Sequence, residues 1–397
     1  MNVSHILAVA LAVTLIAGAL LSALRAFVAP RAIPDRLTTA VFAAMRHAFD
    51  LSLRGRRSEA ARERLLVFYA PVSLLTLPVV WLSFLLAGYM ALFWGLGAPT
   101  WRAAFTMSRL SLLYLGIDAA AEPSTTIVAF SETVFSLLLA AILVSYLPAL
   151  YGAFSQREAA VTGLETLAGS PPSPVAMLTR YHRIAGMDHI GEVWDRWLSW
   201  FEVVQESHTS LQALVFYRSP EPERSWVTAA GAVLDTAALV ASTLERPRDP
   251  QAELCLRAGY LCLRRIAGSF AIPYNPDPAP DDPISVTRAE YDAVYDDLAR
   301  VGVPLKADRA QAWRDFAGWR VTYDAVLVAL AVLTVAPPAP WSSDRVPRRW
   351  SALTRPETRS RAVAAAIASQ PEPRVGAHDA RHRRGTMTMT TTMMRDN

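Results

Sequence analysis

Glu132 is an ionisable residue that lies early in a long hydrophobic segment. A carboxylate can bind a cation or a proton, but it is costly to hold in lipid. We therefore expect Glu132 to face a helix bundle or a water-filled cavity. The alternative is that Glu132 lies at the outer membrane interface, accessible to water, with no role for ions.

Elsewhere the reactive residue types do not form a catalytic or metal-binding motif. The three histidines of the middle region are not spaced for one metal site; they are His182, His189 and His208. Cys255 and Cys262 are separated by about 10 Å of helix rise and cannot bridge each other, so we expect two reduced core cysteines. The sequence has no glycine-rich phosphate loop or nucleophile elbow. We expect no enzyme, no cofactor and no metal site.

The composition places Glu132 in a membrane protein. The chain has 397 residues, of which 52% are hydrophobic and 19% charged, which excludes a disordered chain. The net charge of +4, with arginine mixed among acidic residues, argues against a nucleic-acid surface. Lys306 is the only lysine, so nearly every cationic side chain is arginine. This preference indicates GC-rich coding and hence a bacterial chain. The apolar excess is concentrated before residue 156, so membrane helices must position Glu132.

Three segments are long enough to cross a hydrocarbon core of about 30 Å. The first is Ile6–Leu24. A cleaved signal peptide is the alternative, but Met1–His5 contains no lysine or arginine, so we expect a retained span. The second, Leu65–Leu96, is too long for a straight crossing, so it tilts, kinks at a proline or begins in the cytosol. The third is Thr126–Tyr151.

The charge pattern predicts the orientation of these spans. Nine arginines and four acidic residues lie between Arg25 and Arg64, and such an excess marks the cytoplasmic side. We therefore expect an amino terminus outside, a cytoplasmic carboxyl-terminal half and a location in the plasma membrane. Val41–Leu53 has apolar residues at helical spacing and is expected to lie along the inner interface.

The segment between the second and third spans has the pattern of a re-entrant loop. Trp101–Leu115 is semi-apolar and helical, but it is too short to cross a membrane, and a turn of small residues follows it. Non-helical backbone exists at membrane depth only when protein buries it or it lines a water-filled cavity. The alternative is an amphipathic helix lying on the outer surface.

The end of the third span and the turn beyond it carry a resemblance to a known family. The stretches Val144–Glu158 and Ala168–Pro172 resemble a bacterial potassium-channel-like family, and further matches extend the resemblance over residues 5–342. The resemblance implies four copies around a four-fold axis. It also implies an outer helix, a pore helix, a filter and an inner helix, at Leu65–Leu96, Trp101–Tyr114, Leu115–Asp118 and Ser124–Phe154.

The filter departs from the pattern of that family, which is Thr-x-Gly-aromatic-Gly-Asp. The corresponding residues are Tyr114, Leu115, Gly116, Ile117 and Asp118. One glycine is missing and isoleucine replaces the aromatic residue, although aiming successive carbonyls at one axis needs positive φ angles. We expect this loop not to build the usual potassium filter.

The inner helix departs less from the family. Glu132 lies near the position where the family carries an acidic residue, and no glycine occurs in Ser124–Tyr151, so a glycine hinge is absent. Pro148 is expected to kink the helix near its cytosolic end, with the Ser145 hydroxyl serving freed backbone.

The second half is expected to be an all-α cytosolic domain. We divide the chain into an amino-terminal helix with its basic connection (1–64), a pore-like transmembrane domain (65–155), the helical cytosolic domain (156–341) and a disordered tail (342–397). Six helices are expected in the cytosolic domain, including one continuous helix at Arg309–Val335. The apolar run Ala325–Ala336 is too short for a fourth span and is expected to be a buried helix.

The sequence thus predicts an all-α membrane protein with three transmembrane helices, a re-entrant pore helix and a helical cytosolic domain. The expected function is passive conduction of monovalent cations, potassium among them, through a homotetrameric pore in contact with membrane lipids. Asp118 and Glu122 would form acidic rings at its mouth. The alternative is a non-conducting, membrane-anchored helical scaffold or regulatory protein derived from a channel.

Overall fold

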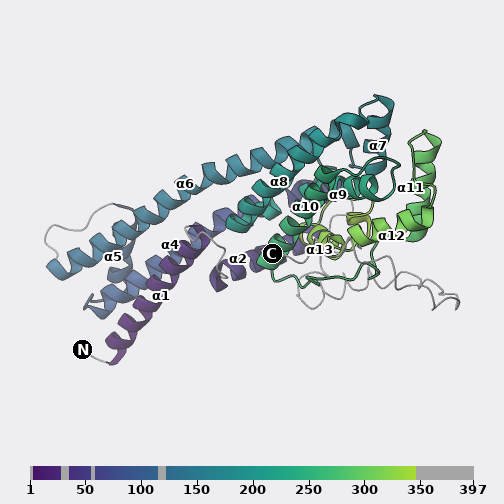
Figure 1. Cartoon of the computed structure of the whole chain (residues 1–397). Helices are drawn as coiled ribbons and strands as arrows, with labels where there is room; N and C mark the ends of the chain where they lie inside the picture. Colours follow the sequence, from purple (N-terminus) through teal and green to yellow (C-terminus); the bar gives the residue numbers. More distant parts are fainter. Residues whose placement is uncertain (1–2, 28–34, 55–58, 115–121, 346–397) are drawn as a thin grey trace.

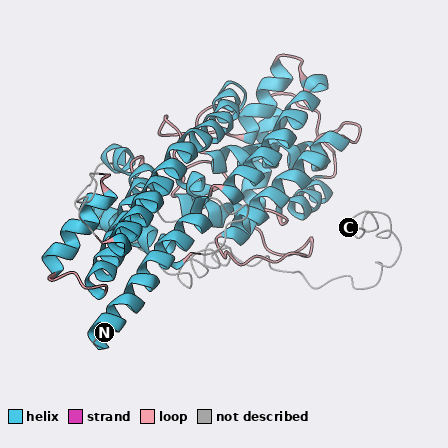
Figure 2. Cartoon of the chain, turned by 90° about the vertical axis from the view of Figure 1, so that its left-hand side faces the viewer, coloured by secondary structure: helices cyan, strands magenta, loops and turns pink. Residues whose placement is uncertain are grey.

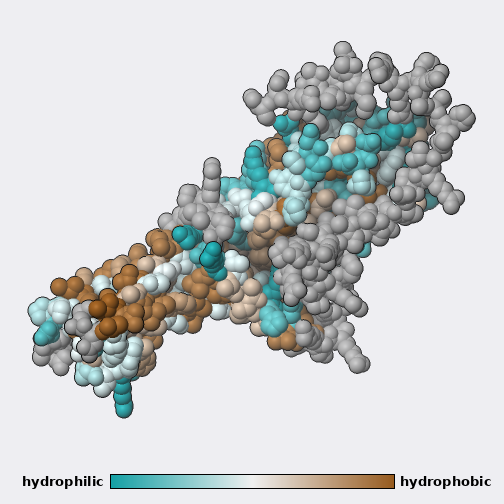
Figure 3. All heavy atoms as spheres, turned by 90° about the horizontal axis from the view of Figure 1, so that it is seen from below, coloured by the Kyte–Doolittle hydropathy of each residue, from teal (hydrophilic) through white to brown (hydrophobic). Residues whose placement is uncertain are grey.

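The computed structural model describes residues 3–27, 35–54, 59–114 and 122–345. Within these ranges the regular structure is helical, apart from one isolated β-bridge between Leu244 and Leu305 (Figure 2). An arm of long helices extends from a body of shorter ones (Figure 1). Hydrophobic side chains cover much of the arm, and hydrophilic ones are more frequent on the body (Figure 3).

The arm contains the three helices that are long and apolar enough to span a membrane. They are α1 (Val3–Phe27), α4 (Tyr69–Gly95) and α6 (Pro123–Ala168), which confirms three candidate spans. The short helix α5 (Trp101–Leu112) lies between α4 and α6 in sequence and contacts both.

Helices α1 and α4 pack closely and antiparallel. The imidazole Nδ1 of His5 lies 3.3 Å from the carbonyl oxygen of Gly95, while Trp81 Nε1 donates to Ser22 Oγ at 3.0 Å near the other end of the pair. Gly88 lies against the turn of α1 that contains Ala12, so close that a side chain there would collide with α1. A small residue is therefore required for this approach of the two backbones.

The connection between the first two spans also forms helices. α2 (Arg36–Arg54) buries Val41, Phe49 and Leu53, as the helical spacing predicts. α3 (Glu59–Leu66) precedes α4 and is separated from it by a turn at Val67–Phe68. The apolar segment continues across this turn, and the candidate span that contains α4 is Glu63–Gly95, 33 residues long.

Helix α6 continues far beyond the expected third span. It has 46 residues and ends at Ala168, and the following Gly169 has a φ of +79°, which suits glycine. The expected boundary between residues 155 and 156 therefore falls inside one continuous helix. Pro148 lies within it without ending it.

The body is built around α9 (Trp226–Ser242), in which nearly every residue is buried. The helices around it are α7 (Pro174–Arg183), α8 (Gly191–Ser210), α10 (Pro250–Ser269), α11 (Arg288–Arg300), α12 (Arg309–Arg320) and α13 (Asp324–Thr334), with the 3₁₀ turns η1 (Met187–His189), η2 (Gln212–Phe216) and η3 (Ser343–Arg345). Several of these helices begin at a side-chain cap, and Thr287 and Glu290 form a complete capping box at α11.

Two details of the body differ from the sequence prediction. The expected single helix Arg309–Val335 is wrong, because α12 and α13 are bent by 54° at a short break. The break lets Arg320, the last residue of α12, and Tyr323, which directly precedes α13, both bond to Asp235 on α9. The second detail concerns the start of the tail, since Ser342 and Ser343 are buried and the domain extends at least to Arg345. The rest of the expected disordered tail lies outside the described residues.

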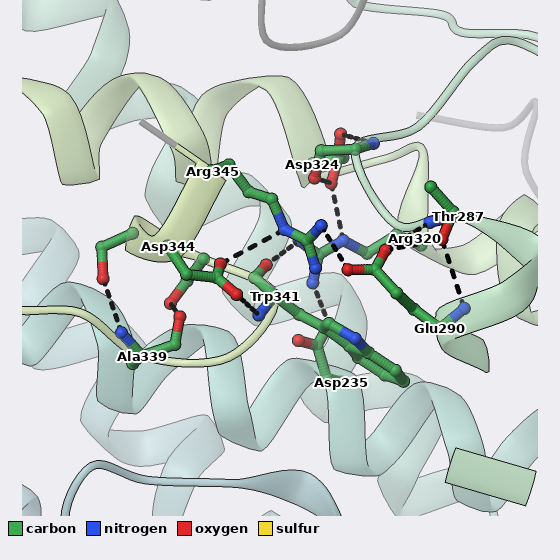
Figure 4. A network of polar contacts seen from close by, with 12 residues as sticks. Asp235, Thr287, Glu290, Arg320, Asp324, Ala339, Trp341, Asp344 and Arg345 are labelled. Atoms are coloured by element: carbon green, nitrogen blue, oxygen red, sulfur yellow. Dashed lines mark hydrogen bonds and ion pairs between the residues drawn. The ribbon is translucent and has the colours of Figure 1, made fainter. Parts of the chain in front are cut away.

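A network of buried charges joins three parts of the body (Figure 4). Arg320 pairs with Asp235 on α9, with Asp324 at 2.7 Å and with the carbonyl oxygen of Trp341. Burial alone would lower the pKa of the guanidinium, but the charges of Asp235 and Asp324 outweigh it and raise that pKa above its ordinary value. Arg320 therefore stays charged while it is fully buried.

Candidate pore-forming site

The short helix α5 folds back along α4 towards the middle of the arm. Its first residue, Trp101, stacks on Trp94 near the end of α4, with ring centroids 4.6 Å apart. Seven residues further along α5, Ser108 Oγ donates to the carbonyl oxygen of Leu86 at 3.2 Å. Since advancing seven residues on α5 means moving eight residues back on α4, the two helices are antiparallel.

One face of α5 is buried in the arm and carries polar groups. Ala104, Ser108 and Ser111 are buried at helical spacing, and the hydroxyl of Thr100 caps the first turn by accepting from the Ala103 amide at 3.1 Å. On the α6 side, Thr133 Oγ1 donates to the carbonyl oxygen of Ser111 at 2.9 Å. α5 is thus fixed to both neighbouring helices by hydrogen bonds.

Glu132 is completely buried and is part of this contact. Its Oε1 accepts a hydrogen bond from Ser108 Oγ at 2.5 Å, and its side chain has no exposed surface. In the described part of the chain, Oε2 has no hydrogen-bond partner. The expectation that Glu132 faces the bundle is confirmed. The alternative of a water-accessible position is wrong for the described structure, because α5 covers the carboxyl.

Neighbouring polar groups on α6 and α4 lie at the same level of the arm. The hydroxyls of Tyr89 on α4 and Ser131 on α6 are 2.8 Å apart. Ser108, Ser111, Tyr89 and Thr133 are members of the site that sequence reasoning missed. The signal that could have found the first two is the spacing of small polar residues on one face of α5.

The two described ends of the α5–α6 connection lie at different levels of the arm. Ser111, close to the end of α5, is bonded to Thr133, whereas α6 begins ten residues earlier, at Pro123. Ten helical residues correspond to about 15 Å. Tyr114 and Glu122 are therefore separated along the axis of α6, and they do not lie at one surface of the arm.

Most of the expected filter cannot be compared with the prediction. Leu115, Gly116, Ile117 and Asp118 lie outside the described residues. Tyr114 has a φ of +59°, a conformation that non-glycine residues rarely adopt, and its side chain is half exposed. Glu122 is exposed at the amino-terminal end of α6, where the helix dipole favours a negative charge.

The other expected inner-helix residues lie on a different face from Glu132. Ser145 and Pro148 are exposed, and they belong to a face of α6 that continues from one end of the expected span to the other. We call it the open face of α6; its exposed members include Ile127, Phe130, Val134, Leu137, Ala141, Val144, Ser145, Pro148 and Gly152. Ser145 Oγ donates to the carbonyl oxygen of Ile142 at 2.9 Å. The expectation that it serves the carbonyl freed by Pro148, which is that of Val144, is therefore wrong.

Beyond the arm, α6 is clamped to the body through Arg157. The buried guanidinium donates to the carbonyl oxygens of Leu214 at 3.0 Å and Tyr217 at 2.8 Å and pairs with Glu158 at 2.7 Å. In return, Trp200 Nε1 donates to the carbonyl oxygen of Arg157 at 3.1 Å. A movement of α6 at this level would therefore be transmitted to the segment that contains η2.

Arg157 also contacts a buried histidine of α8. His208 Nε2 lies 3.3 Å from the Arg157 guanidinium, and its ring packs on Trp226. Burial and the neighbouring charge of Arg157 hold the pKa of His208 well below its ordinary value. His208 is therefore neutral near pH 7, which lets Nε2 accept a hydrogen bond from the guanidinium.

The described cysteines are not placed for reactivity, and the described residues contain no metal cluster. Cys255 and Cys262 are free and buried, and burial raises the pKa of both thiols. Over the described ranges, no group of three or more histidine, cysteine or acidic side chains is placed to hold a metal ion.

Comparison with other proteins does not identify the chain. No family model, no curated protein and no solved structure matches it. Within the class that the fold defines, an all-helical protein with three candidate membrane spans, the function has to be argued from the geometry of α4, α5 and α6.

Proposed function

We propose that this protein is a channel-like integral membrane protein that conducts monovalent cations passively through a homotetrameric pore. In this proposal α4 is the outer helix, α5 the re-entrant pore helix and α6 the inner helix. One chain supplies a single loop between two spans, so several copies are needed to surround a conduction path.

The observation that carries the proposal is the placement of α5. It returns along α4 for eight residues, and Ser108 bonds to both Leu86 and Glu132. A helix lying on the outer surface would have little reason to bury serines against the middle of two spans. The polar contacts suit a helix held at membrane depth, where each unsatisfied polar group is costly.

The open face of α6 supports the same proposal. In its half nearer the body it carries small or polar side chains, among them Ala141, Ser145 and Gly152, which leave room for a water-filled path. The resemblance of Val144–Glu158 to the inner helix of potassium-channel-like proteins points in the same direction.

The proposed orientation places the body in the cytoplasm of a bacterial cell and the first residues of α1 outside. The contact between His5 and Gly95 puts the start of α1 beside the end of α4, and the arginine-rich α2 follows at the other end. That distribution of arginines favours a cytoplasmic location for the end of the arm that joins the body.

We further propose that the pore discriminates weakly among cations. Only one glycine is available in Tyr114–Asp118, and four-fold rings of carbonyls normally need more. Acidic rings of Asp118 and Glu122 at the outer mouth would concentrate cations by charge instead of selecting them by size.

Cation flux into liposomes tests the proposal. Purified protein whose tetrameric mass has been measured is reconstituted, and the uptake of potassium and of sodium is followed at equal gradients. We expect uptake of both ions above that of empty vesicles, and partial block when Ser145→Trp narrows the path. A confirmed tetramer that passes neither ion would overturn conduction.

The rival proposal is a non-conducting scaffold derived from a channel. It is favoured by the filter sequence and by the tight clamp of Arg157 on the body. It predicts that Gly116→Val and Asp118→Asn leave the cellular function intact. A clear loss of function in either variant, at unchanged protein level, would count against the scaffold.

A further inference from the structure

The outward face of α5 carries a charge for which the described structure contains no acidic partner. Trp101, Phe105 and Arg109 recur at every fourth position and are all exposed, the first two by 46% and 43%. In the described part of the chain, the guanidinium of Arg109 forms no ion pair and no hydrogen bond. The opposite face, with Ala104 and Ser108, packs on α4 and α6. One face of α5 is thus occupied and the other is open.

Arg109 lies close to the middle of the length of a membrane span. Its neighbour Ser108 bonds to Leu86, which lies nine residues before the end of α4 at Gly95. Nine residues of helix correspond to about 14 Å, which is close to half of a hydrocarbon core of about 30 Å. Arg102, in contrast, belongs to the first turn of α5 and can reach water at the outer end.

An arginine at such a depth does not face lipid without a partner. Charged side chains in spans are turned towards protein or a water-filled cavity, because the hydrocarbon cannot solvate them. The neighbours of Arg109 on the open face, Phe105 and Trp101, are aromatic and do not favour a surface that lines water. A protein surface therefore fits this face best.

The open face of α6 offers exposed hydrophobic side chains at the same depth as Arg109. Phe130 and Val134 belong to the open face of α6 and are 69% and 43% exposed. Phe130 is two residues from Glu132, which is bonded to Ser108, so Phe130 and Arg109 lie at nearly the same depth. An aromatic ring attracts a guanidinium by cation–π interaction, most strongly where water is excluded.

We propose that the open face of α5 docks on the part of the open face of α6 farther from the body, at Phe130 and Val134 of a second copy of this chain, with Arg109 against the ring of Phe130 of the partner subunit. The inference rests on the proposed placement of α5 at membrane depth. The contact joins two different surfaces, so each copy offers one surface to each of two neighbours. Such head-to-tail contacts close into a ring when the rotation permits, which is the assembly that a pore requires.

Disulfide trapping in liposomes tests the contact. The native cysteines are buried, so a thiol introduced on the arm is the accessible one. Phe105 lies one helical turn before Arg109, at the level of Ile127, which is one turn before Phe130 on α6. We expect the double variant Phe105→Cys with Ile127→Cys to give a ladder of dimers, trimers and tetramers on oxidation, while each single variant gives none. Phe105→Cys with Tyr151→Cys is the matched control, because Tyr151 is as exposed as Ile127 but lies about 36 Å further along α6. Absence of the ladder, or the same ladder from the control pair, overturns the contact.

The strength of self-association in detergent gives a second measurement. We expect Arg109→Ala and Phe130→Leu each to weaken assembly about tenfold or more, and the double variant to be no weaker than either. Arg102→Ala is the control and should leave the mass distribution unchanged. Equal behaviour of the Arg109 and Arg102 variants contradicts the proposal. Cation flux measured in parallel separates the proposed contact from the proposed conduction. A disulfide ladder without flux supports the contact and argues against conduction. Flux without a ladder supports conduction and argues against the contact.

Discussion

The Oγ atom of Ser108 on α5 lies 2.5 Å from Oε1 of Glu132 on α6, and both side chains are completely buried. The same hydroxyl also reaches the carbonyl oxygen of Leu86 on α4. One serine therefore joins three helices at one level of the arm. The hydroxyl has a single hydrogen, so Ser108 shares it between the carboxyl oxygen of Glu132 and the carbonyl oxygen of Leu86.

The first prediction concerns that carboxyl group. We expect Glu132→Gln to keep the fold, because the amide oxygen of glutamine can also accept a hydrogen bond from Ser108 Oγ, whereas Glu132→Ala should destabilise the protein by about 1–3 kcal/mol. Thermal unfolding followed with a thiol-reactive dye measures the effect, since Cys255 and Cys262 become accessible only on unfolding. Glu122→Gln is the exposed control. A melting point for Glu132→Ala equal to that of the control would mean that the contact contributes nothing.

The second prediction concerns the packing of α1 on α4. A Cβ atom at Gly88 would lie 2.8 Å from Ile16 Cγ1 and 3.3 Å from the carbonyl oxygen of Ala12, so Gly88→Val should force the helices apart and cost about 1–3 kcal/mol or more. Gly18 on α1 has nothing within 4 Å of the corresponding position. Gly18→Ala should therefore leave the melting temperature unchanged or raise it slightly. Comparable losses from both substitutions would show that backbone flexibility matters here, not close packing.

The spans could be predicted because hydrophobic length is a local property of the sequence. The same reasoning places α5 within three residues of its observed end and predicts that Glu132 faces the bundle. It could not show that Ser108 meets Glu132, because the contact joins residues 24 positions apart and depends on how α5 is tilted against two other helices.

Local patterns do not reveal which charges are buried. Arg320 and Asp324 are spaced by four residues, which is typical of a surface pair, yet both are buried in the described structure. Asp235 lies in an apolar run of α9, 85 positions before Arg320. Only the tertiary fold makes the three residues neighbours, and the break between α12 and α13 follows from the same long-range contacts.

The third prediction concerns this buried network. Asp235→Ala leaves the Arg320 guanidinium with one carboxylate fewer in a fully buried position, and we expect a loss of about 3–5 kcal/mol. The control is Asp297→Ala, which breaks the exposed pair of Asp297 with Arg300 and should cost less than about 1 kcal/mol. Unfolding in denaturant, followed through tryptophan fluorescence, distinguishes the two. Equal costs would mean that Arg320 finds water or another acceptor when Asp235 is removed.

The fourth prediction concerns the clamp between α6 and the body. Arg157→Leu removes the donors to Leu214 and Tyr217, so their carbonyl groups lose a buried partner. We expect hydrogen exchange to increase at least tenfold in residues 211–217, while exchange in α9 stays unchanged. Gln156→Leu, at the exposed neighbouring position, is the control. Protection of 211–217 that survives Arg157→Leu would show that apolar packing alone holds the segment.

The last prediction is a pH dependence that arises from His208. Its pKa in the folded protein is well below its ordinary value of about 6.5, so the unfolded chain binds the extra proton more readily than the folded protein does. The stability contributed by the neutral ring is therefore complete above about pH 6.5 and is lost as the pH falls below it. The loss can reach about 1.4 kcal/mol for each pH unit. His208→Gln keeps an acceptor for Arg157 but cannot titrate, so the difference in unfolding free energy between wild type and His208→Gln should change between pH 7.5 and pH 5.5. A difference that is constant over that range would mean that the ring is already protonated or reaches water in the folded protein.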